Sequence, residues 1–160
     1  MTEVSETRQN PWRGATLALR VGLALSLASA VGLFIDQTSA HSLAEHVSAQ
    51  YSPYGAVPDP NVLFGYLYAT AGLAIAAWLI ALRGVRSRKS WVRLFASVTF
   101  LVGAMLAVFN LVIREYGTPI FPVLWSVLGL LPALAGLVAV SLLWTRASRR
   151  PGPALELTSP

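Results

Sequence analysis

The chain has 160 residues, of which 55% are hydrophobic and 12% charged, and its formal net charge is +5. It contains no cysteine, which excludes structural disulfides and cysteine-ligated metal centres. Its basic residues flank apolar segments and form no basic face on a soluble element, so we expect no nucleic-acid binding. The sequence carries no catalytic or cofactor motif, and we expect no cofactor.

Four apolar segments dominate the chain, and each reaches the roughly 20 residues needed to cross a bilayer. Only the first contains a charged residue, Arg20, near its start. The sequence therefore predicts an all-α protein, a four-helix transmembrane bundle that occupies residues 15–148 as one membrane domain. The expected spans are residues 15–35, 62–82, 94–113 and 119–144.

Positive charges lie on alternate connections between the spans. All but one of the 12 Lys and Arg residues lie in the first tail and the start of the first span, between the second and third spans, or in the last tail. The exception is Arg114. Because short positively charged connections stay in the cytoplasm, we expect a multi-pass protein of the cell membrane with both termini cytoplasmic. The polar tails, residues 1–14 and 149–160, are expected to be disordered.

The first span has an alternative interpretation as a signal peptide cleaved before His41. Arg13 and Arg20 would form its basic region, and residues 38–40 its small-residue cleavage site. The apolar run is longer than a usual signal core, which favours an uncleaved first span.

The longest connection, residues 36–60, is expected to lie outside the membrane and to contain a short helix over residues 39–51. Apolar residues recur there every four positions, and Ser42 with Glu45 forms a possible capping box. Such a helix would lie on the outer surface or cover the end of the bundle.

This helix carries a possible metal-binding group. His41 and Glu45 are four residues apart and share a helical face, but His46 points away from them. The spacing is one residue too long for an inverted zincin motif. Solvated side chains on a surface helix are the simpler interpretation, and a metal site is the alternative.

The connection between the second and third spans is strongly basic. It could contact anionic lipid or a partner protein; the simpler interpretation is a cytoplasmic anchor for the two flanking spans. Its basic residues are Arg83, Arg86, Arg88, Lys89 and Arg93.

The remaining polar groups gather at the predicted outer ends of the spans. Asp36 ends the first span and Arg114 follows the third, which predicts an ion pair between them. Arg114 could instead meet Glu115, Asp59 or lipid phosphate. In the tight outer connection that follows, Gly117 is a plausible helix C-cap and Pro119 a plausible first residue of the fourth span.

Small residues recur on one face of each span and predict its packing surface, because small side chains let helix backbones approach closely in lipid. Pro132 is expected to kink the fourth span. The predicted packing residues are Gly22, Ser26, Gly65, Gly72, Gly103, Ala107, Gly129, Ala133 and Gly136.

Three short stretches resemble small four-span proteins of unknown function that are common in actinobacteria. They are the basic turn leading into Trp91–Arg93, Tyr51–Tyr54, and Leu128–Leu137. The resemblance covers about residues 15–146, implies a four-helix bundle in the cell membrane, and supplies no catalytic residues. The abundance of arginine over lysine is typical of GC-rich bacterial genomes. DoxX-like and sterol-isomerase-like proteins share the four-span topology, but the latter use acidic residues inside the bundle, which this chain lacks.

The spans hold no ionisable group at the bilayer midplane, which argues against a proton-coupled exporter. We expect a non-enzymatic membrane component that binds membrane lipid, a partner membrane protein or a second copy of itself. The first alternative is a carrier or binder of a small apolar molecule, opening outward near Asp36, Tyr66, Asn110 and Arg114. The second is a membrane enzyme that uses these outer-mouth residues.

Overall fold

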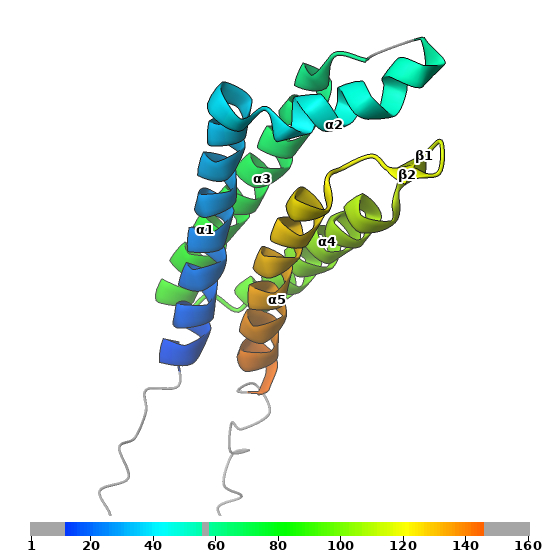
Figure 1. The fold of residues 1–160 in the computed structure, drawn as a ribbon. Coiled ribbons are helices and arrows are strands. Elements are labelled where there is room, and N and C mark those ends of the chain that lie inside the picture. Colours follow the sequence, from blue (N-terminus) through cyan, green and yellow to red (C-terminus); the bar gives the residue numbers. More distant parts are fainter. Residues whose placement is uncertain (1–11, 56–57, 146–160) are drawn as a thin grey trace, which may run out of the picture.

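The computed structural model describes residues 12–55 and 58–145, which form four long helices and a short polar cap (Figure 1). Each long helix is long and apolar enough to cross a membrane. The predicted all-α architecture with four spans is therefore confirmed. The long helices are α1 (Trp12–Ile35), α3 (Pro60–Arg86), α4 (Val92–Val112) and α5 (Val123–Thr145).

The cap lies at one end of the bundle, which we call the cap end. A π-helical turn, Asp36–Ala40, continues α1 and leads into α2, which spans Ser42–Tyr51 and is followed by the 3-10 turn Ser52–Tyr54. A small antiparallel hairpin, β1 (Arg114–Glu115) and β2 (Thr118–Pro119), lies beside α2 (Figure 1). At the opposite, terminal end α1 begins, α5 ends and α3 turns into α4.

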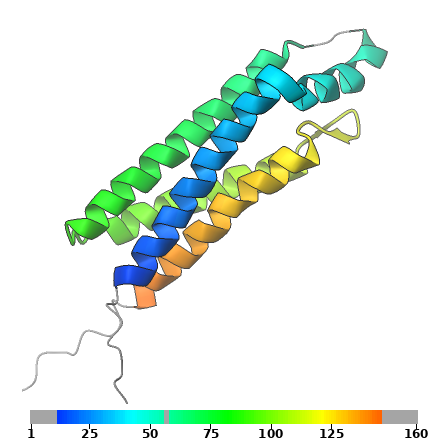
Figure 2. The ribbon, with the colours of Figure 1, turned by 60° about the vertical axis from the view of Figure 1, so that its left-hand side comes forward.

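The four long helices form an incomplete ring. Helix α1 packs extensively against α3 and α5, and α5 packs extensively against α4, whereas α3 and α4 touch sparingly. The order around the bundle is thus α3, α1, α5, α4, with α1 beside both α3 and α5 in Figure 2. Because the first and last members of this series barely pack together, the bundle is open on one side.

Two apolar clusters hold the bundle at its ends. Near the terminal end, buried residues of all four long helices meet, among them Leu19, Val92 and Leu143. Near the cap end, Leu43 of α2 packs with Leu33, Phe64 and Trp125, so the short helix is part of the core.

Between these clusters, α1 and α3 approach closely at Gly22. The Trp78 indole Nε1 donates to Ser26 Oγ at 3.0 Å, and Ser26 Oγ donates to the Gly22 carbonyl at 3.0 Å. A Cβ atom at Gly22 would lie 2.4 Å from the Trp78 ring, so only glycine fits this position. At Gly136 of α5 an added Cβ would meet Phe100 at 3.0 Å and the same Trp78 ring at 3.6 Å.

The other predicted packing residues divide into two groups. Ala107 is buried and Ala133 half-buried, as a packing role requires. At four glycines, by contrast, an added Cβ atom would meet nothing within 4 Å, so the single chain makes no close helix approach there; they are Gly65, Gly72, Gly103 and Gly129. Two of them, Gly103 and Gly129, line the cavity described below.

Several predicted boundaries also move. Helix α5 begins at Val123, and Pro119 lies in β2. Gly117 is no helix C-cap, because Tyr116 (φ 52°) and Gly117 (φ 81°) both have positive φ and form the two-residue turn of the hairpin. Helix α1 starts at Trp12, inside the predicted tail 1–14, while the rest of that tail and residues 149–160 lie outside the described residues.

Candidate functional site: a lateral cavity beneath a polar cap

The open side of the bundle leads into a cavity of about 540 Å³, which we call the central cavity. Its deep wall comes from α1 and α5, where Leu19, Ser26 and Leu33 are buried. Its rim comes from α3 and α4, where Leu73 and Val98 are exposed. The cavity therefore opens between α3 and α4, sideways toward the lipid that would surround four spans.

The wall of the central cavity is almost entirely apolar and contains no ionisable side chain. Its hydroxyl groups are already bonded within their own helices: Ser29 donates to Leu25 O at 2.9 Å and Thr99 to Phe95 O at 2.8 Å. Thr70 likewise bonds the carbonyl of its own preceding turn. Such hydroxyls leave a surface suited to hydrocarbon.

A hydrogen bond closes the cap end of the opening. Tyr66 of α3 donates to Asn110 Oδ1 of α4 at 2.8 Å, and the Tyr66 ring stacks on Phe121 with 5.7 Å between centroids. Asn110 lines the central cavity, whereas Asp36, Tyr66 and Arg114 do not. The cavity thus opens sideways in the structure, and an outward opening near these four residues stays a prediction.

The central cavity also reaches a buried donor that has no partner. Trp125 lines the cavity and is 8% exposed, yet its Nε1 meets no acceptor among the described residues. A buried N–H without an acceptor is unfavourable by about 1–3 kcal/mol. A ligand with an oxygen atom at the cap end of the cavity could supply an acceptor.

Asp36 anchors the cap, and its role differs from the predicted one. Its carboxylate is buried and accepts from the backbone N–H groups of Ser42 at 2.9 Å and Leu43 at 3.1 Å, and from the Ser42 hydroxyl. It therefore caps the N-terminus of α2 from six residues upstream, where a negative charge also favours the helix dipole. The predicted capping box with Glu45 is wrong, because Ser42 is already inside the helix and Glu45 is exposed.

The expected ion pair between Asp36 and Arg114 is likewise absent from the part of the chain that the structure describes. Both carboxylate oxygens of Asp36 accept hydrogen bonds from the start of α2, and Arg114 lies in the hairpin.

The far end of α2 is held by the hairpin. The His46 ring Nε2 donates to Pro119 O at 2.9 Å, and Gln50 Nε2 donates to Glu115 O at 3.0 Å. Tyr51 donates to the Glu115 carboxylate, and Tyr54 stacks on Tyr116 with 4.0 Å between ring centroids. These contacts join the two connections at the cap end into one layer.

Tyr51 is the titratable group whose environment this layer changes most clearly. The hydrogen bond to Glu115, together with burial and the nearby negative charge, raises the pKa of Tyr51 to about 12. The phenol is therefore kept protonated by its acceptor, as a structural bond requires.

The predicted group of His41, Glu45 and His46 is not brought together. His41 and Glu45 are exposed, while His46 is half-buried and turned to the hairpin. Within residues 12–55 and 58–145, no three His, Asp or Glu side chains lie close enough to hold a metal ion.

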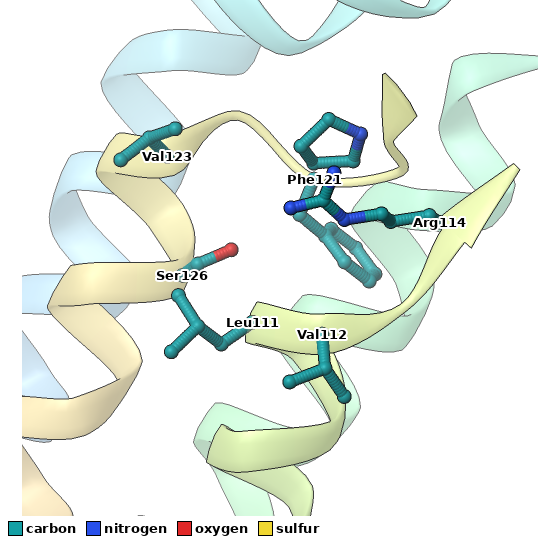
Figure 3. A pocket seen from close by; sticks show the side chains of 7 residues that line it. Leu111, Val112, Arg114, Phe121, Val123 and Ser126 are labelled. Carbon is teal, nitrogen blue, oxygen red and sulfur yellow. The ribbon is translucent and has the colours of Figure 1, made fainter. Parts of the chain in front are cut away.

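Arg114 contributes to a second hollow, of about 370 Å³, where α4 ends, the hairpin turns and α5 begins (Figure 3). We call it the cap-end pocket. The pocket combines one cation and one hydroxyl with apolar walls. Its lining residues are Leu111, Val112, Arg114, Pro119, Phe121, Val123 and Ser126.

The basic connection lies at the terminal end, where α3 turns into α4. Basic side chains surround the α3–α4 turn. Four of them are exposed, namely Arg83, Arg86, Arg88 and Lys89, and Arg93 is half-buried. The turn itself is close-packed, because a Cβ atom at Gly84 would lie 2.2 Å from Val92.

Comparison with protein-family models, curated proteins and solved structures gives no match. The geometry of the chain is therefore the basis for its proposed function.

Proposed function

We propose that this protein is a non-enzymatic component of the cell membrane that binds a lipid-like molecule in the central cavity. The ligand enters from the membrane between α3 and α4. We place the terminal end at the cytoplasmic face, because the basic residues gather there. The cap then lies on the outer face.

The lateral opening is the observation that carries the proposal. A cavity of about 540 Å³ lies within the range of roughly 300–1,000 Å³ typical of small-molecule sites. Its rim faces the hydrocarbon region of a membrane, so an apolar molecule can reach it without crossing water. Its apolar wall offers dispersion contacts over the length of a chain or ring system.

The polar groups around the cavity support binding over chemistry. The hydroxyls of its wall are bonded within their helices, and the Asn110 carbonyl oxygen accepts from Tyr66. Two donors lie at the cap end of the cavity, the Asn110 amide nitrogen and the unpartnered Trp125 Nε1. They favour a ligand with a hydrogen-bond acceptor at one end, such as an ester, a ketone or a hydroxyl.

Native mass spectrometry of the protein purified gently from its own membranes tests the proposal. We expect the wild-type chain to carry an added mass, identified as a lipid-like molecule after extraction. Gly103→Phe places a ring in the cavity wall and should abolish the added mass. Gly65→Phe is the matched control, because this exposed glycine also has open space around it but does not line the cavity.

Three results would contradict the proposal. The wild type could travel as a bare chain, Gly103→Phe could retain the mass as fully as Gly65→Phe, or a stoichiometric protein partner could be found in place of a lipid. The last result would favour a partner-binding component.

A further inference from the structure

The cap-end pocket has the composition of a site for an amphipathic anion. It lies where α4 ends, so its upper part falls at the boundary between the apolar span and the polar cap. Figure 3 shows the Arg114 side chain reaching across the mouth of the pocket beside Phe121. The pocket therefore places one cation beside an apolar hollow, which matches a lipid that has an anionic head group joined to apolar chains.

Arg114 has no acidic partner among the described residues that could neutralise it. Its neighbour Glu115 lies on the other face of the strand and accepts from Tyr51. Guanidinium groups pair with phosphate and carboxylate oxygens through two parallel N–H donors. The pocket also borders the first turn of α5, and the N-terminus of a helix carries partial positive charge.

The walls of the pocket lead away from this charge into the apolar layer. Val112 is 60% exposed and Val123 is 66% exposed, and both belong to the ends of helices that can span the membrane. Ser126 Oγ faces the pocket but donates to Asn110 O at 3.2 Å, so its proton is engaged. The side-chain donors thus come from Arg114 alone, and the remaining contacts are apolar.

The surroundings favour an anion delivered by the membrane over a dissolved one. The other ionised side chains described at the cap end are acidic, namely Asp36, Glu45, Asp59 and Glu115. They weaken the attraction of this end for any anion, so a small anion from the water would have only its contact with Arg114 to offset the repulsion. A phospholipid reaches the pocket sideways, and its chains gain contacts with α4 and α5 that a free anion cannot make.

We propose that the cap-end pocket binds an anionic phospholipid of the adjacent leaflet, with Arg114 paired to a head-group oxygen and an acyl chain lying along α4 and α5. This site is separate from the central cavity and does not depend on its ligand.

The test compares phosphatidylglycerol with phosphatidylcholine of the same chains, added to delipidated protein and counted by native mass spectrometry. Because the basic connection also attracts anionic lipid, the readout is the difference between variants. Arg114→Gln should lower the preference for phosphatidylglycerol several-fold, because the neutral amide loses its attraction to the net negative charge that phosphatidylcholine lacks. Arg114→Lys should retain part of it.

Two matched variants separate this site from the others. Arg88→Gln removes an exposed cation at the terminal end and should leave the Arg114-dependent component unchanged. Gly103→Phe fills the central cavity and should also leave it unchanged, so failure here and failure of the proposed function are distinguishable. An unaltered preference in Arg114→Gln would overturn the proposal, and so would displacement of the lipid by dissolved glycerol phosphate.

Discussion

Trp78, Ser26 and Gly22 form one connected contact between α3 and α1. Its indole donates to Ser26, and Ser26 donates to the Gly22 carbonyl, so the ring lies over the place where a Gly22 side chain would be. In lipid no hydrophobic effect drives helices together, and such close packing with interhelical hydrogen bonds takes its place. A methyl group at Gly22 would clash with the Trp78 ring unless the indole moved and broke its hydrogen bond to Ser26.

Gly22→Ala is therefore expected to destabilise the bundle by about 1–3 kcal/mol, the usual range for overpacking. Thermal or denaturant unfolding in detergent would measure it. Gly65→Ala is the control, because a Cβ there meets no atom within 4 Å and alanine favours the helix. Equal stability of the two variants would show that the indole moves aside freely.

At the scale of elements, α2 and the β1–β2 hairpin form a layer that depends on one protonated phenol. The pKa of Tyr51 is raised to about 12 because its proton is donated to Glu115. A pKa raised on folding means that the folded state favours the protonated form. The contribution of this bond to stability is complete below pH 10 and is lost as the pH rises toward 12.

We expect the stability difference between wild type and Tyr51→Phe to be largest below about pH 10, the ordinary pKa of tyrosine, and to vanish near pH 12. Unfolding measured against pH in an ester-free detergent would show it, and the near-ultraviolet absorbance of tyrosinate should report one tyrosine fewer at high pH in the variant. A difference that stays constant across this range would mean that Tyr51 does not titrate with its bond to Glu115.

The helices were predictable from sequence to within a few residues, because runs of apolar residues with no charge have few other ways to fold. The cap was not. Ser42 and Glu45 match a local capping pattern, but Asp36 lies closer in space than in sequence and satisfies the same donors better. Likewise, Pro119 can open a helix or end a strand, and the positive φ angles at Tyr116 and Gly117 decide for the hairpin.

The sequence indicated some residues that line the central cavity and the cap-end pocket, but not which residues share a site. Asn110 and Arg114 lie one helical turn apart and share a face in the α4 pattern, yet Asn110 faces the central cavity and Arg114 the cap-end pocket. The chain leaves the helix at Ile113, whose extended backbone turns Arg114 aside. The rows of small residues indicated which helix faces could pack closely. They could not show that α3 and α4 would make few contacts with each other.

Over the whole molecule, charge is divided between the two ends. The described acidic residues all lie at the cap end, and every described basic residue except Arg114 lies toward the terminal end. From the positive-inside rule we therefore expect the terminal end to face the cytoplasm.

The absence of cysteine makes this orientation easy to test. Ser48→Cys adds an exposed thiol on α2, and Ser87→Cys adds one on the α3–α4 turn. In intact cells we expect a membrane-impermeant maleimide to label the first variant, and to label the second only after the membrane is opened. The reverse pattern would invert the topology and place the cap in the cytoplasm.

Helix α1 has a consequence for how the protein is made. It precedes both of its packing partners in the chain, and one of them, α5, is the last of the four long helices described. Gly22 and Ser26 therefore lack their packing partner until Trp78 of α3 has been inserted. Leu19 lacks part of the terminal cluster until α5 has been inserted. The packing of α1 is thus complete only after α5 has been made, and chains that stop before α5 would leave this face of α1 open to other helices.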